Sequence, residues 1–148
     1  MRRLPELALT ALLVTLLSGT VAAGASQSTQ RAPTGIQSLE EAKKQGYVPA
    51  GPCVPDMGYH YVNPELVDRN LNPARPEILV FEGNSPSSDK VAAEYFVPGA
   101  LASDAPTLFG QEMKYHSELG GYALHAWFWK HNPEGVFQPF NPAVKACE

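Results

Sequence analysis

The residues of this sequence best suited to chemistry are its four histidines, His60, His116, His125 and His131. Neutral imidazole binds zinc, copper or iron, and three imidazoles around an ion with an open coordination position would suit catalysis. We therefore consider a divalent transition-metal site, with zinc or copper as the ion, built from His60, His125 and His131. His116 lies in the polar stretch QEMKYHSELGG, and we expect it to be a solvated loop residue.

The spacing of these histidines does not match a known metal-ligand motif. The sequence contains no H-x-H and no H-E-x-x-H, and no two of its histidines lie close together in sequence beside a carboxylate. His125 and His131 would lie about 20 Å apart along an extended strand, too far to share an ion unless Asn132-Pro133 turns the chain back. The competing interpretation is that the histidines only form hydrogen bonds within the fold.

Two acidic residues extend the list of candidates. Glu82 or Glu94 could add an oxygen ligand to the metal site. The same two residues, on neighbouring strands of a hairpin, could also serve as the paired carboxylates of a glycan hydrolase. Two acids on hairpin strands are more often exposed and without a catalytic role. The sequence contains neither a G-x-S-x-G motif for a nucleophilic serine nor a glycine-rich phosphate loop.

Aromatic residues are concentrated near the end of the chain. Half of the Phe, Tyr and Trp residues lie between residues 115 and 140. They could fill the core of a small domain, or they could form a groove for a sugar, a peptide or an apolar ligand. We assign the candidate groove to Trp127, Trp129 and Tyr61. With no catalytic motif present, a binding or structural module without enzymatic activity is the leading functional hypothesis, ahead of a metalloprotein and a hydrolase.

Two cysteines, Cys53 and Cys147, lie at the two ends of the expected core. In an exported chain two cysteines most simply form one disulfide. Closing so long a loop would stabilise the fold by about 4–5 kcal/mol on the chain-entropy model. Free thiols are the alternative, but neither cysteine has a neighbouring histidine.

The elements that must position these residues are mostly strands. The sequence predicts a short strand and three longer ones, each bounded by Pro, Gly or a polar link: residues 57–62, 77–82, 90–97 and 121–130. Residues 90–96 also fit a helix, because Ala and Glu favour one. In residues 121–130, alternation places His125, Trp127 and Trp129 on one face with Ala123, and Leu124 and Phe128 on the other.

A short helix is predicted before the strands. Ser38 is a good N-cap, Glu41 completes a capping box, and Gly46 suits a C-cap. Because Leu39 and Ala42 are its only apolar positions, we expect a weakly packed surface helix. The predicted fold is a β-rich α+β domain, with an antiparallel sheet of about four strands and one or two short helices, closed by one disulfide.

The first residues resemble a secretory signal peptide. Arg2 and Arg3 precede an apolar run from Leu7 to Leu17, and small residues then lead to a cleavage site near Ala25/Ser26. The apolar run is shorter than the roughly 20 residues that a membrane span needs. We therefore expect a signal peptide over residues 1–25, a disordered arm over 26–36 and a single globular domain over 37–148, located in the periplasm or the medium.

Charge and repetition add little to the functional choice. The net charge is −4, without a basic cluster, which argues against nucleic acid or an anionic membrane as a partner. Residues 63–74 (NPELVDRNLNPA) and 132–143 (NPEGVFQPFNPA) are similar. A duplicated unit would explain this similarity, but Asn-Pro turns that arose independently explain it more simply. The partner could be a small molecule, a glycan or a protein.

Several segments together have a family likeness. The segment CVPDMGYHYVNP, the strand YALHAWFWKHNP and the closing cysteine resemble a family of small exported proteins of unknown function. That family is marked by a Cys-x-Pro-x-Met-Gly-x-His segment, a run rich in Asn-Pro and a Leu-His-x-Trp strand. The resemblance covers residues 53–147. It implies an exported domain centred on Met57-Gly58, His60 and His125, and it implies no activity.

Overall fold

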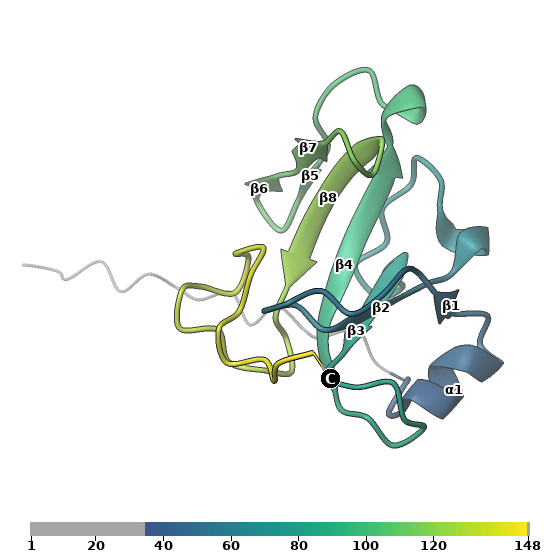
Figure 1. Cartoon of the computed structure of the whole chain (residues 1–148). Coiled ribbons are helices and arrows are strands. Elements are labelled where there is room, and N and C mark those ends of the chain that lie inside the picture. The colour runs from purple at the N-terminus through teal and green to yellow at the C-terminus, as the bar shows by residue number, and fades with distance from the viewer. Residues whose placement is uncertain (1–34, 148) are drawn as a thin grey trace, which may run out of the picture.

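The computed structural model describes residues 35–147, and the expected signal peptide and most of the expected arm lie outside these residues (Figure 1). Within this range a six-stranded antiparallel sheet has the order β1-β2-β3-β4-β8-β7. Its strands are β1 (Val48–Pro49), β2 (Tyr59–Val62), β3 (Ile78–Phe81), β4 (Lys90–Pro98), β8 (Gly121–Ala126) and β7 (Lys114–His116). The remaining elements are helix α1 (Leu39–Lys44), the 3-10 turns η1 (Pro64–Leu66) and η2 (Gly99–Leu101), and the hairpin of β5 (Thr107–Leu108) and β6 (Gln111–Glu112).

The β-rich, antiparallel character of the fold is confirmed, but the expected number of about four strands in the sheet is too low. The four central strands, β2, β3, β4 and β8, are the four that the sequence predicts. The two edge strands, β1 and β7, contain two and three residues. Segments this short carry too little alternation of apolar and polar residues to be recognised in sequence.

Two of the predicted strands correspond to β4 and β8. Residues 90–98 form β4, which confirms the strand and excludes the helix. The predicted strand over residues 121–130 is too long, because β8 ends at Ala126. There the N–H of Phe128 donates to the carbonyl of Ala126, and the N–H of Trp127 donates to the carbonyl of Val136. These bonds interrupt the regular pairing with β4 at Trp127 and Phe128, before the N–H of Trp129 donates to the carbonyl of Val91 on β4. Trp127 and Trp129 therefore do not continue one strand face.

The main core lies on the face of the sheet that α1 covers. One cluster packs Leu39 and Ala42 of α1 against Tyr61, Leu79 and Phe81. Further along the same face, residues of β4 and β8 pack against the chain around β5 and β6: Ala93, Tyr95, Val97, Leu124, Ala126 and Met113. Because every strand alternates, the side chains between these residues point to the opposite face, where the candidate site lies.

Helix α1 begins as predicted, but its packing was underestimated. The Ser38 side chain accepts a hydrogen bond from the N–H of Glu41, which confirms the N-cap. Leu39 and Ala42 are fully buried, so α1 is part of the core and not a weakly packed surface helix. Ile36, which we expected in the disordered arm, is buried in the same cluster. Two apolar positions are enough to pack α1 into the core, because Leu39 and Ala42 both face the sheet.

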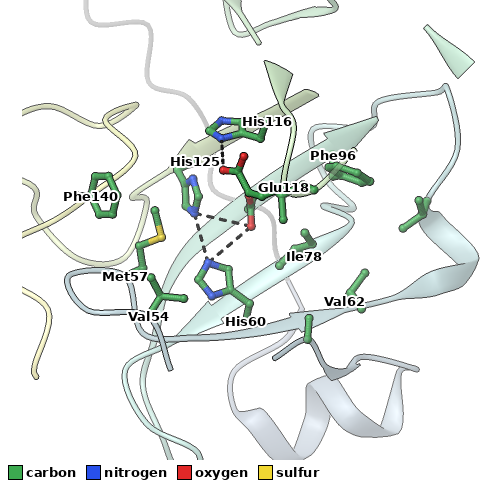
Figure 2. Close-up of a pocket in the computed structure, with 14 residues that line it drawn as sticks. Val54, Met57, His60, Val62, Ile78, Phe96, His116, Glu118, His125 and Phe140 are labelled. Atoms are coloured by element: carbon green, nitrogen blue, oxygen red, sulfur yellow. Dashed lines mark hydrogen bonds and ion pairs between the residues drawn. The ribbon is translucent and has the colours of Figure 1, made fainter. Parts of the chain in front are cut away.

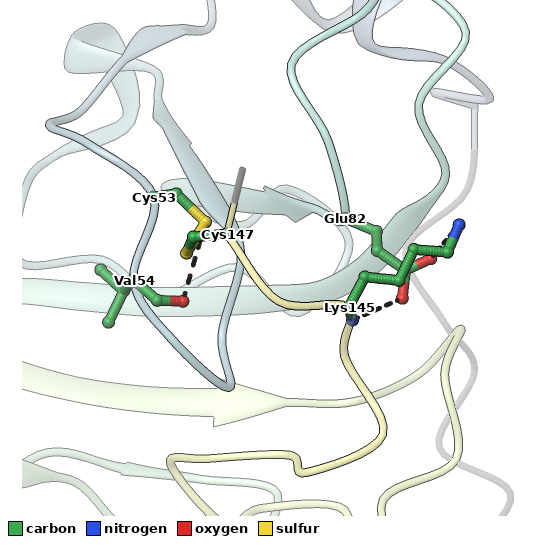
Figure 3. Close-up of a disulfide and its surroundings, with 5 residues drawn as sticks. All are labelled: Cys53, Val54, Glu82, Lys145 and Cys147. Carbon is green, nitrogen blue, oxygen red and sulfur yellow. Dashed lines mark hydrogen bonds and ion pairs between the residues drawn. A yellow bond between two sulfur atoms is a disulfide. The ribbon is translucent and has the colours of Figure 1, made fainter.

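The predicted disulfide between Cys53 and Cys147 is confirmed, with 5.7 Å between the two Cα atoms (Figure 3). Next to it, Glu82 binds the C-terminal segment: its carboxylate accepts hydrogen bonds from the N–H of Lys145 at 3.1 Å and from Nζ of Lys130 at 2.6 Å. These contacts hold the end of the chain against the loop after β3.

The first Asn-Pro turn of each similar segment makes the same kinds of contact. Asn63 Oδ1 accepts a hydrogen bond from the N–H two residues later, and its Nδ2 donates to the carbonyl of Gln45. Asn132 likewise caps the N–H of Glu134, and its Nδ2 donates to the carbonyl of Phe140. Local capping by a buried asparagine is therefore sufficient to explain why the pattern recurs.

Among residues 35–147, no helix has both the length and the apolar composition required to cross a bilayer.

Candidate functional site

Two histidines and one glutamate converge on the sheet face opposite α1. His60 Nε2 lies 3.4 Å from His125 Nε2, and each of these nitrogens lies 3.7 Å from Glu94 Oε2. The two imidazoles point toward each other (Figure 2). Glu94 and His125 are almost completely buried, and His60 is nearly so. We refer to His60, Glu94 and His125 as the His-Glu-His cluster.

The register of the sheet explains why these three residues meet. Glu94 on β4 lies directly opposite His125 on β8, so their side chains stand on the same face. His60 on β2 lies opposite Val80 on β3, which in turn lies opposite Ala92, two residues before Glu94. Strands β2 and β4 are about 10 Å apart, because β3 lies between them. The longer side chains of His60 and Glu94 therefore lean over β3 to meet.

Gly58 allows β2 to approach β3 where His60 is positioned. Its φ is +105°, which glycine adopts readily. A Cβ at this position would lie 2.4 Å from the carbonyl oxygen of Phe81 on β3. Any other residue would push β2 away from β3 and would displace His60. The Met57-Gly58 pair before His60 thus has a direct structural explanation.

Burial dominates the electrostatics of the cluster. It lowers the pKa of His125 to about 4, with the nearby His116 acting in the same direction. Burial also lowers the pKa of His60, although the charge of Glu94 acts in the opposite direction. Burial raises the pKa of Glu94. Both imidazoles are therefore neutral near pH 7, which is the form that binds metal ions.

The cluster has the dimensions of a metal site. A point equidistant from three atoms separated by 3.4, 3.7 and 3.7 Å lies about 2.1 Å from each of them, which matches the 2.0–2.2 Å of Zn–N and Zn–O bonds. Two imidazoles and a carboxylate on three strands would leave at least one coordination position unfilled by the cluster. The chemical character of the three groups and their spacing both fit a divalent transition-metal ion.

A cavity of about 510 Å³ opens beside the cluster. Its lining combines the three residues of the cluster with mainly apolar side chains, and the polar pair His116 and Glu118 lies near the cluster (Figure 2). His116 Nδ1 is 3.3 Å from Glu118 Oε1. The apolar lining comes from Ala50, Val54, Met57, Val62, Val67, Ile78, Phe96, Leu119 and Phe140.

The other predicted metal ligands lie elsewhere. His131 is exposed and stands outside the group formed by His60, Glu94 and His125. Glu82 forms ion pairs with Lys130 and Lys145. Although partial burial acts to raise the pKa of Glu82, the hydrogen bonds from these lysines hold it below its ordinary value. Glu94 lines the cavity and Glu82 does not, so the two carboxylates do not form one site.

The three residues assigned to an aromatic groove are found in packed positions. Trp127 is 3 % exposed, and its Nε1 donates to the carbonyl of Gln138. Tyr61 is buried against α1. Trp129 is half-buried, with Lys90 Nζ 3.9 Å above its ring. The residues around the cavity include none of the three.

Sequence reasoning did not place His116 at the cavity. His116, expected to be a solvated loop residue, lies at the end of β7 and is partly buried beside the cluster. The pairing of β7 with β8 places it there, opposite Gly121. No local signal in the polar stretch around His116 indicates this pairing.

Comparison of the chain with protein-family models, with curated proteins and with solved structures gave no match. The resemblance to small exported proteins with a Cys-x-Pro-x-Met-Gly-x-His segment therefore stays a prediction.

Proposed function

We propose that this protein binds one divalent transition-metal ion, zinc or copper, through His60 Nε2, His125 Nε2 and a carboxylate oxygen of Glu94. The observation that carries the proposal is the convergence of these three atoms, from three different strands, at separations of 3.4–3.7 Å. Imidazole nitrogen and carboxylate oxygen together suit both Zn²⁺ and Cu²⁺.

The metal interpretation accounts for the burial of three ionisable groups, Glu94, His60 and His125, in one place. A buried carboxyl and two buried imidazoles each require hydrogen-bonding partners or a charge of opposite sign. An ion bound among them supplies that charge and replaces the proton that burial favours on Glu94. The coordination position left open by the cluster can accept water or a ligand from the cavity.

The test begins with elemental analysis of protein purified without an affinity tag, followed by zinc and copper titration against a chromophoric chelator. We expect one equivalent of metal per chain. The variants His60→Ala, His125→Ala and Glu94→Gln should weaken binding by more than the roughly 10–100-fold caused by changes outside the ligand set.

His131→Ala is the matched control, because it removes an exposed imidazole from the same chain. It should bind metal with wild-type affinity. Glu94→Gln provides a check on folding, since a neutral amide in this buried position should not destabilise the metal-free protein while metal affinity is lost. An absence of saturable binding, or equal losses in His131→Ala and His125→Ala, would refute the proposal.

A further inference from the structure

The cavity beside the cluster is the second unexplained feature of this face. It is large enough for a small organic ligand, since ligand pockets typically measure about 300–1,000 Å³, and this one measures about 510 Å³. Most of its wall is apolar, and Val62, Ile78 and Phe96 stand on the same sheet face as the cluster. A ligand here would bury an apolar body while one end reaches the cluster.

Charge selects the kind of head group. Two neutral imidazoles, one carboxylate and a divalent ion carry a net charge of +1. Among the described residues that line the cavity there is no Lys or Arg. Glu118, the other acidic residue of the lining, has a side chain that is 70 % exposed and lies 3.3 Å from His116 Nδ1. The ion would therefore be the main positive charge available to a ligand. A monoanion neutralises this charge, whereas a neutral or cationic head group does not.

The direction of the apolar body follows from the sheet. Val62 lies opposite Ile78, and Ile78 lies opposite Glu94, so these side chains form one row with the cluster. Phe96 lies two residues beyond Glu94 on the same face of β4. An extended alkyl chain that starts at the cluster can therefore lie along Val62, Ile78 and Phe96.

We propose that the cavity binds a linear medium-chain carboxylate, with its carboxylate on the metal ion and its alkyl chain against Val62, Ile78 and Phe96. This inference rests on the proposed function, because the ion supplies the charge that recognises the head group. Each buried CH₂ contributes about 0.8 kcal/mol. The affinity should therefore increase about three- to four-fold with each CH₂ added from hexanoate to decanoate.

The experiment is calorimetric titration of the zinc-loaded protein, comprising residues 26–148, with hexanoate, octanoate and decanoate. All three are used below their micellar concentrations. Zinc uptake is measured first. We expect decanoate to bind the loaded protein with one-to-one stoichiometry. Metal-free protein and His125→Ala should bind it at least about ten-fold more weakly, and decan-1-ol should bind the loaded protein more weakly than decanoate does.

Val62→Asp tests the place of the alkyl chain, and Val48→Asp is its control. Val62 lines the cavity, whereas Val48 is exposed on β1 outside it. A carboxylate at position 62 should weaken decanoate binding at least ten-fold in protein that has taken up zinc, and the same change at position 48 should have no effect on decanoate binding.

The outcomes separate this inference from the proposed function. Protein that takes up zinc but does not bind decanoate, or that binds all three chain lengths or decan-1-ol equally, would overturn the inference and leave the metal site intact. Protein that takes up no zinc would overturn both.

Discussion

Glu77, directly before β3, should make the stability of this protein fall as the pH rises from about 4.5 to about 8. Its side chain is 2 % exposed, and Oε2 accepts a hydrogen bond from the N–H of Phe96 at 3.1 Å. Burial is the main cause that raises its pKa from 4.5 to about 7, and the distant charge of Asp68 adds to it. The backbone hydrogen bonds act in the opposite direction.

The sign and the magnitude follow from linkage. Because the folded state binds this proton more tightly than the unfolded state, the contribution to stability is fully present below about pH 4.5 and is lost as the pH rises through about 7. Since 1.36 kcal/mol corresponds to one unit of pKa, the loss is on the order of 3 kcal/mol. Glu77→Gln retains an oxygen acceptor for the N–H of Phe96 and cannot ionise.

The assay is urea denaturation of metal-free, disulfide-intact protein between pH 4.5 and 8.5. Glu77→Gln should match wild type near pH 4.5 and should exceed it by on the order of 3 kcal/mol near pH 8, a shift of about 2 M in urea midpoint. The control is Glu112→Gln, which alters an exposed carboxyl on β6. Parallel pH profiles for wild type and Glu77→Gln would refute the claim that Glu77 is held protonated in the fold.

Three further predictions concern the stability of the fold. Unfolded, unreduced protein should show no labelling by a thiol reagent, and removing the Cys53–Cys147 bond should lower the free energy of unfolding by about 4–5 kcal/mol; stoichiometric labelling would contradict this. Gly58→Ala should lower the free energy of unfolding by on the order of 3 kcal/mol or more, because the new methyl group would meet the carbonyl of Phe81. The control Gly51→Ala, with φ +87° and open space around it, should lower it by only about 1–2 kcal/mol. Equal losses in urea denaturation would exclude the contact between position 58 and Phe81. Leu39→Ala should lower the free energy of unfolding by about 2–5 kcal/mol in the same assay. A loss below about 0.5 kcal/mol would support the prediction that α1 is weakly packed.

The sequence by itself determined the features that depend on local interactions or on covalent chemistry. Ser38 and Glu41 specified the start of α1, because an N-cap forms between residues close in sequence. The β-branched and aromatic residues of β3, β4 and β8 specified strands, and two cysteines at the ends of the core specified the disulfide. His60 and His125 were chosen as candidate ligands from their type and from their similar surroundings.

The tertiary structure decided which residues lie beside His60 and His125. Glu94 completes the cluster and His131 does not, because β4 pairs with β8 in a register that sets Glu94 opposite His125, while this regular pairing ends at Ala126. The same pairing of distant segments brought His116 to the cavity and placed Tyr61 and Trp127 in packed positions. Register depends on contacts between segments far apart in sequence, and a single sequence contains no local signal for it.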